Sequence, residues 1–96
     1  MLTELKKELL KARKNKDELK ISVLSYLLSK IQNKQIDLRS DDEELTDLHI
    51  KEVIERQIKA RNDSIEAYEK GGRMDLVEKE EEEKKILKEI LNENFS

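Results

Sequence analysis

The sequence of 96 residues contains no cysteine and no proline, and its only aromatic residues are two tyrosines and one phenylalanine. Without cysteine the chain forms no disulfide, no thiolate nucleophile and no cysteine-based metal site. The shortage of aromatic rings leaves Leu, Ile and Val to build the core, and it makes base stacking a minor mode of nucleic-acid binding. No apolar run approaches the roughly 20 residues that a membrane span needs, so we expect no membrane partner.

Charged residues are abundant, at 45% of the chain, and glutamate, lysine and leucine dominate. These straight-chain residues lose little rotamer freedom in a helix, so the composition favours long helices. The net charge of −3 hides an asymmetry, because residues 1–39 hold ten Lys and Arg against five Asp and Glu, whereas residues 40–96 hold ten against eighteen. The acidic whole is a poor general binder of nucleic acid, but the basic end can still contact phosphate.

The N-terminal stretch carries no secretion signal, because it has basic residues but no apolar core. Its basic residues at helical spacing faintly resemble a transit or membrane-surface helix, but Glu4 and Glu8 are atypical of a transit peptide. We therefore interpret this stretch as a solvated helix face. Together with the absence of cysteine, this interpretation predicts a cytoplasmic location.

The spacing of apolar residues predicts four helices, over residues 4–14, 17–38, 46–70 and from 73 onward. Thr3, Asp17 and Thr46 are the expected N-cap residues, since their side-chain oxygens accept hydrogen bonds from the first free amides of a helix. Gly71 is expected to end the third helix in the left-handed conformation. Residues 39–44 lack periodicity and are predicted to form a loop.

The third and fourth helices are predicted to fold back on each other about the glycine pair, which places Arg61 opposite Glu82. The glutamate-rich start of the fourth helix is most simply a solvated face supported by Glu–Lys pairs four residues apart. The alternative is an ion pair across the hairpin from Arg61 to Glu82. The other carboxylates open to that alternative are Glu80 and Glu83, which lie on the apolar stripe of the fourth helix.

The sequence thus predicts an all-α, four-helix bundle-like domain built around a long antiparallel helical hairpin. The second helix is the most apolar segment, and Leu28→Ala is expected to cost about 2–5 kcal/mol of stability. The expected core consists of Leu24, Leu27, Leu28, Ile31, Ile54, Ile58, Ile65, Leu87 and Ile90.

Two long segments, residues 10–37 and 53–87, resemble the YqeY-like family, and the resemblance extends over essentially the whole chain. Its most specific parts are residues 14–17, the segment from Arg61 to Arg73 with its Gly-Gly pair, and residues 78–80. That family is related to the tail of the B subunit of the glutamine-dependent aspartyl/glutamyl-tRNA amidotransferase. The resemblance implies an all-helical N-terminal domain over residues 1–96.

Family members usually continue into a small helical C-terminal domain, which is the part associated with tRNA. Where they typically show a Leu-Pro junction, this chain has Leu91-Asn92 and then stops at Ser96. We therefore expect the tail-like domain to be absent from this chain, which makes it an open question whether these 96 residues bind tRNA.

Residues that could carry catalysis are scarce. There is no glycine-rich phosphate loop, and His49 is the only histidine and has no partnered serine beside it. The acidic run of residues 41–44 lacks the spaced ligands and central glycine of a calcium loop. We therefore expect no catalytic site, no metal and no cofactor.

Two functions remain open. The first is an accessory or binding module of tRNA-dependent amidotransfer, a carbon–nitrogen ligase system with glutamine as amido-N-donor by resemblance, with tRNA or an amidotransferase-like protein as partner. Its expected phosphate contacts are Lys11, Arg13, Lys14, Lys16 and Lys20, with Lys30 and Lys34 further along. The alternative is a protein-interaction or oligomerisation domain unrelated to tRNA, with a second copy among its candidate partners. An enzyme in its own right is the least favoured interpretation.

Overall fold

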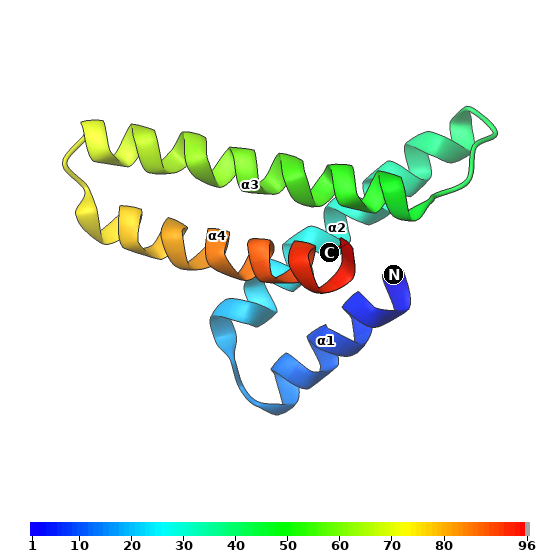
Figure 1. Ribbon diagram of the computed structural model, residues 1–96, viewed down its shortest axis with the longest axis horizontal. Helices are drawn as coiled ribbons and strands as arrows, with labels where there is room; N and C mark the ends of the chain where they lie inside the picture. Colours follow the sequence, from blue (N-terminus) through cyan, green and yellow to red (C-terminus); the bar gives the residue numbers. More distant parts are fainter. Residues whose placement is uncertain (96) are drawn as a thin grey trace. The chain divides into compact units, whose positions relative to one another are not determined.

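The computed structural model describes residues 1–95, and these residues form four α-helices joined by short connections (Figure 1). The helices are α1 (Leu2–Lys14), α2 (Glu18–Ser40), α3 (Asp47–Lys70) and α4 (Met74–Phe95). The all-α prediction is confirmed, since the described residues contain helices and turns but no strand. The chain divides into two compact units, Met1–Val53 and Ile54–Ser96, so the boundary lies inside α3.

The first unit is held together by the packing of α1 against α2. α1 contributes Leu5 and Ala12, which are 0% and 3% exposed. The buried side chains of α2 are Val23, Leu24, Leu27, Ile31 and Leu38. Leu28 is only half-buried, so the predicted core is wrong at that position and the inward face of α2 is rotated toward Leu27. Unit 1 also buries Ile50 and Val53 in the first turns of α3.

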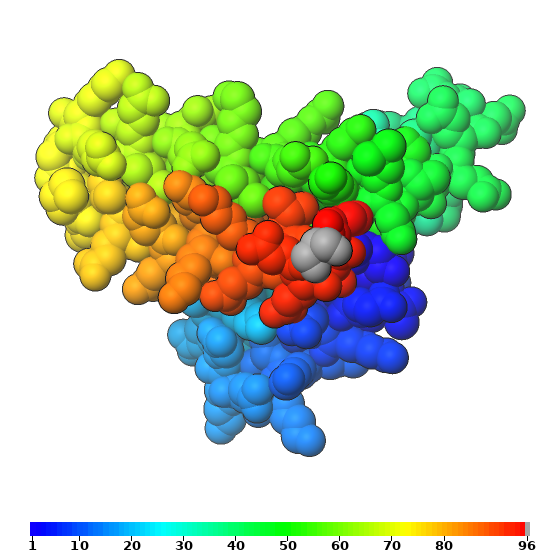
Figure 2. All heavy atoms as spheres, in the orientation of Figure 1, coloured from blue at the N-terminus to red at the C-terminus, as the bar shows by residue number. Residues whose placement is uncertain are grey.

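The second unit is the predicted antiparallel hairpin, in which α4 runs back along α3 (Figure 1). The gap that separates the two helices in the ribbon diagram is filled by atoms in the space-filling view (Figure 2). The buried apolar residues of this unit are Ile54, Ile65, Val77, Leu87 and Ile90. Ile58 was predicted to join them but is half-buried, because it lies toward the edge of the hairpin in an open groove beside Leu91.

The ends of α1, α2 and α3 share one backbone arrangement, the Schellman motif, in which two amides beyond the helix bond back to its last carbonyls. These bonds run from Lys16 and Asp17 to α1, from Asp42 and Glu43 to α2, and from Gly72 and Arg73 to α3. The residue in the left-handed conformation has φ of 56° at Lys16, 57° at Asp42 and 70° at Gly72. Two of the three left-handed positions therefore carry a side chain. Because neither of these two residues is a glycine, the left-handed conformation could not be predicted there from the sequence.

The helix beginnings follow the predicted caps at two of three places. Asp17 caps α2 by accepting a hydrogen bond from the Lys20 amide at 3.2 Å, and Thr46 precedes α3 as predicted. α1 begins earlier than predicted, with Met1 and not Thr3 as its N-cap residue, because the Leu5 amide already donates to the Met1 carbonyl at 3.1 Å. Helix α2 also continues through Arg39 to Ser40, where a loop had been expected.

The glycine pair offers a direct test of the third turn. Gly72 takes the left-handed position that was predicted for Gly71, and Gly71 is the residue before it. Gly72→Ala should therefore cost about 1–2 kcal/mol, the penalty of a left-handed residue with a side chain. Gly71→Ala should be neutral or stabilising by up to about 1 kcal/mol, because the new Cβ would lie at an ordinary 3.6 Å from the Ala67 carbonyl oxygen. Urea denaturation of both variants measures the difference, and equal losses would contradict the assignment.

Candidate functional site

Four cationic side chains gather where α1 ends and turns into α2. We call this group the basic corner, and it consists of Lys11, Arg13, Lys14 and Lys16. All four are exposed, and within residues 1–95 none of them forms an ion pair with a carboxylate. Elsewhere, Lys20, Lys59, Arg61, Lys70 and Arg73 each have an acidic partner within 4 Å. Other exposed cations, such as Lys79, Lys85 and Lys88 on α4, also lack an ion pair within the described residues, so what sets the corner apart is that four such cations follow one another closely in the chain. The basic corner therefore presents uncompensated positive charge to solvent.

Local structure explains part of this arrangement. Lys11, Arg13 and Lys14 lie in the last turn of α1, where cations interact favourably with the negative end of the helix dipole, by about 0.3–1 kcal/mol each at low salt. Lys16 has no such explanation, because it lies beyond the helix in the left-handed conformation. That conformation costs a residue with a side chain about 1–2 kcal/mol. The turn therefore carries a cation where glycine would be more stable.

Lys20 was predicted to belong with these cations, but the structure gives it a different role. Its ammonium lies 3.2 Å from the Glu8 carboxylate, and both side chains are 33% exposed. The pair connects α2 to α1 and compensates the charge of Lys20. Lys30 and Lys34 lie further along α2, and the Lys30 ammonium stands 5.2 Å from the centre of the Tyr26 ring, a distance typical of a cation–π contact.

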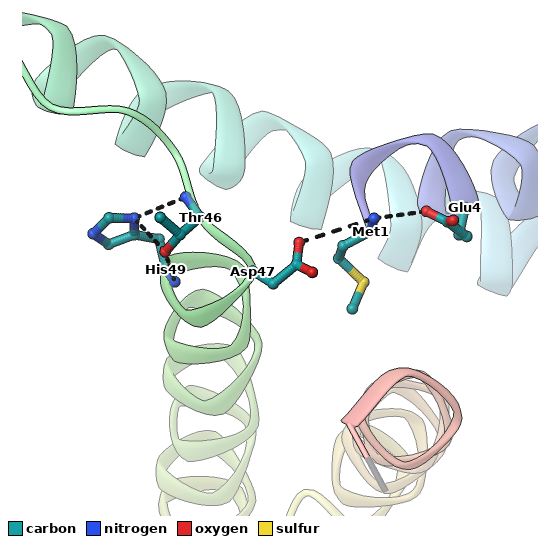
Figure 3. A network of polar contacts seen from close by, with 5 residues as sticks. All are labelled: Met1, Glu4, Thr46, Asp47 and His49. Atoms are coloured by element: carbon teal, nitrogen blue, oxygen red, sulfur yellow. Dashed lines mark hydrogen bonds and ion pairs between the residues drawn. The ribbon is translucent and has the colours of Figure 1, made fainter.

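The only histidine of the chain caps α3 together with Thr46 (Figure 3). The Thr46 amide donates to His49 Nδ1 at 3.0 Å, and the His49 amide donates to Thr46 Oγ1 at 3.4 Å. This reciprocal pattern is a capping box in which histidine takes the position usually held by glutamate or glutamine. Because Nδ1 accepts the amide hydrogen, the neutral ring carries its proton on Nε2.

The hydroxyl of Thr46 also lies 3.0 Å from His49 Nδ1, the spacing of a nucleophile and its base. A catalytic pair of this kind needs a third group that orients the base. No hydrogen bond from His49 Nε2 is found to any residue in the described range. The contact is therefore accounted for by the helix cap.

The first residue of the chain lies beside the same helix start (Figure 3). The Met1 amine is 2.7 Å from the Glu4 carboxylate and 3.9 Å from that of Asp47. The hydrogen bond to Glu4 is the main cause that raises the pKa of the amine, and the same bond lowers the pKa of Glu4. Within unit 1 these contacts connect the beginning of α1 to the first turn of α3.

A second polar cluster lies inside the α3–α4 hairpin. We call it the Arg61 cluster, and it consists of Arg61, Glu80 and Glu83. One guanidinium nitrogen, Arg61 Nη1, lies 3.1 Å from Glu80 Oε2 and 3.0 Å from Glu83 Oε2. The three side chains are 24%, 12% and 13% exposed, so two carboxylates share one cation with little solvent.

The balance of charge in the Arg61 cluster is not favourable for Glu80. Burial is the largest influence on this carboxyl group and raises its pKa, and the like charge of Glu83 raises it further, whereas Arg61 lowers it. Arg61 Nη1 donates a hydrogen bond to Glu83, whereas its contact with the buried Glu80 Oε2 is an ion pair without a hydrogen bond, and Arg61 Nε is buried without a hydrogen-bond partner. Desolvation therefore reduces the stabilisation that the attraction between Arg61 and the two carboxylates provides.

The partner of Arg61 is not Glu82, which was predicted to lie opposite it. Glu82 is exposed and lies beside Glu78 and Lys85 on the outer surface of α4. The position of a residue along an antiparallel helix pair decides which residue of the other helix lies at the same height. Whether the two side chains meet depends on the direction in which each one points from its helix. Glu80 and Glu83 follow Val77 at steps of three on the inward face, so the stripe alternative was the better guide.

Two features are missing from the described residues, a cluster of metal-ligand side chains and a helix that could cross a membrane. Across residues 1–95, no three His, Asp or Glu side chains are grouped as they would be around a metal ion. None of the helices α1 to α4 combines the length and the apolarity that crossing a membrane requires. The acidic run at the end of α2 instead supplies its C-cap, Asp41, and the left-handed Asp42.

Comparisons with known proteins bear on the whole chain. The sequence profile of the family described as Yqey-like protein matches residues 2–96. A protein of Lachancea thermotolerans named "Altered inheritance of mitochondria protein 41, mitochondrial" is 41% identical over 92 residues, which cover 96% of this chain and 48% of that protein. The protein of the same name from Kluyveromyces lactis is 42% identical, over 90% of this chain and 45% of that protein.

An uncharacterized protein of Schizosaccharomyces pombe is 34% identical over 96% of this chain and 72% of its own length. This chain therefore spans about half the length of the Lachancea and Kluyveromyces relatives and a larger share of this one. The names of the first two overturn the cytoplasmic location predicted from the sequence, because they point to mitochondria. Absence of cysteine and of an apolar span did not distinguish the two compartments.

Proposed function

The chain belongs to the Yqey-like protein family, and from that membership and the basic corner we propose that it is an accessory module that binds the phosphate backbone of tRNA. The observation that carries the proposal is the set of four exposed, uncompensated cations at the α1–α2 turn. Lys and Arg bind phosphate without reading base sequence, so they confer affinity and position and not specificity.

Lys16 extends this surface beyond the end of α1, where it holds the left-handed position of the Schellman turn. Asp42 holds the same position at the end of α2, so the support that Lys16 gives is its charge and place and not its backbone conformation. The link to tRNA-dependent amidotransfer rests on the family resemblance, and the module would serve that system by holding RNA, with the chemistry supplied by other subunits. Because relatives are named mitochondrial, mitochondrial tRNA is the first RNA to test.

The test is a titration of tRNA with the wild-type chain and with the triple variant Lys11→Glu, Lys14→Glu, Lys16→Glu. Four phosphate contacts predict that log K falls with log salt at a slope of about −3 to −4, or a loss of roughly 60-fold or more between about 50 and 200 mM salt. The triple variant should lose most of that affinity and most of the salt slope, because only Arg13 remains of the corner.

A matched control changes the same charge elsewhere. Lys79, Lys85 and Lys88 are exposed on α4, and their triple exchange to glutamate alters the net charge equally. This control should keep tRNA binding within about threefold of the wild type, since it leaves all four proposed phosphate contacts unchanged. Absence of binding by the wild type, or an equal loss in both triple variants, would refute the proposed phosphate site.

A further inference from the structure

An open groove of about 400 Å³ lies between α1 and α2 in the first unit. Its apolar lining comes from Leu2 and Leu9 on α1 and from Leu28 and Ile31 on α2. Leu2, Leu9 and Leu28 remain half-buried, although they surround a continuous surface. The first unit therefore leaves apolar area in contact with water at a place where two helices already supply the walls.

The spacing of the lining residues matches a third helix. On α1 the groove follows Leu2, Lys6, Leu9 and Arg13, at steps of four, three and four, which trace one helix face. At 1.5 Å per residue this stripe extends about 16 Å, the length of about three helical turns. On α2 the small residues Ser25 and Ser29 line the same groove one turn apart and allow a helix backbone to approach closely.

The positive charge along the groove favours a helix that carries acidic residues. Lys6 and Arg13 lie on its α1 side, and no carboxylate lines it. Neither cation forms an ion pair with any of residues 1–95. A docked helix with apolar residues toward the floor and acidic residues along its flanks would meet both features, which is the helix-in-groove mode of recognition.

We propose that the α1–α2 groove binds an amphipathic helix of a partner protein, with an apolar stripe flanked by acidic residues. A second copy of the chain offers no matching surface in the part that the structure describes. The large apolar residues it exposes there are scattered over four helices, as Leu10, Tyr26, Ile36, Leu48 and Met74. RNA fits the groove less well than a helix does, because its floor is aliphatic and provides no ring for a base to stack on.

The experiment uses the full chain and a synthetic helical peptide as the probe. The peptide is about three to four turns long, carries leucines at steps of four, three and four, and has glutamates on both flanks. A second peptide replaces the glutamates by lysines. Amide chemical shifts of the labelled chain report the binding surface, and the expected result is saturable shifts at Lys6, Leu9, Leu28 and Ser29 with the acidic peptide.

The variant Ser29→Trp fills the groove without removing a buried side chain, because Ser29 is exposed. Ser22→Trp is its matched control, since Ser22 is an exposed serine of α2 that does not line the groove. Ser29→Trp and the lysine peptide should each weaken binding about tenfold or more, whereas Ser22→Trp should leave it unchanged. Neither serine belongs to the basic corner. Arg13 lines both the corner and the groove, but Lys11, Lys14 and Lys16 lie outside the groove, so both variants should still bind tRNA.

Several outcomes would overturn this assignment. Shifts that lie outside the groove, no shifts at saturating peptide, or equal binding of the lysine peptide would each show that no acidic helix docks there. Shifts of the groove residues that grow with protein concentration alone, and that Ser29→Trp abolishes, would identify a second copy as the occupant. Groove shifts on adding tRNA, without any on adding the acidic peptide, would assign the groove to RNA.

Discussion

Leu24→Ala should lower the free energy of unfolding by about 2–5 kcal/mol, the range for removing a large aliphatic side chain from a packed core. Leu24 is 0% exposed and lies in the first half of α2. The substitution removes apolar contacts and leaves a cavity that its neighbours fill only in part. For a chain of this size the loss corresponds to a melting temperature lower by about 10 °C or more.

Leu28→Ala is the matched control, with the same chemical change one helical turn further along α2. Sequence alone predicted the large loss at this position. Because Leu28 is half-buried and lines the α1–α2 groove, truncation removes less area from contact and opens no enclosed cavity, so we expect about 1 kcal/mol or less. Urea denaturation with a common slope measures both variants. A loss at Leu28 as large as that at Leu24 would show that Leu28 belongs to the packed core as fully as Leu24 does.

The difference between these two leucines shows what periodicity leaves undetermined. Apolar residues occupy positions 23, 24, 27, 28 and 31 of α2, so they cover a broad arc of the helix. Any face within that arc satisfies the helical period, and the packing of α1 selects the one through Leu24, Leu27 and Ile31. Helix positions and the caps Asp17 and Thr46 were predictable, because they depend on chemistry a few residues away.

The candidate sites were predictable to different degrees for the same reason. The excess of lysine and arginine near the α1–α2 turn is visible in the sequence, but the pairing of Lys20 with Glu8 depends on how two helices meet. The left-handed conformation of Lys16 and Asp42 was not predictable, because neither residue is a glycine and each conformation is fixed by the hydrogen bonds that close its turn. Glu80 and Glu83 could be proposed from the apolar stripe, whereas the choice between them and Glu82 needed side-chain directions.

Arg61→Ala should lower the free energy of unfolding by about 1–3 kcal/mol. The cost of removing one partner of a fully buried ion pair is about 3–5 kcal/mol, and partial exposure of Arg61, at 24%, reduces it. The variant leaves Glu80 and Glu83 facing each other without a cation. Lys59→Ala is the control on the same helix, because its pair with Asp63 is exposed and is worth about 0.5 kcal/mol or less. Equal effects of the two variants would contradict a buried Arg61 cluster.

The same cluster should make stability depend on pH through Glu80. Its pKa is raised above the ordinary value of 4.5 in the folded chain, so the folded state holds this proton more tightly than the unfolded state does. Its contribution to stability is therefore complete below the ordinary value and is lost as the pH rises through the raised one. Glu80→Gln removes this titration, and the wild-type stability minus that of the variant should fall as the pH rises over that interval.

Glu83→Gln provides the comparison that separates this titration from a general loss of charge. It removes the like charge of Glu83 but leaves burial, the largest influence that raises the pKa of Glu80. A smaller decline of stability above the ordinary carboxyl pKa should therefore remain in this variant and be absent in Glu80→Gln. Exposed carboxylates such as Asp75, whose pKa is lowered by Arg73, act at more acidic pH and cancel between variants. Denaturation across the acidic range decides the matter: if Glu80→Gln keeps the wild-type pH profile, burial of Glu80 is not the cause.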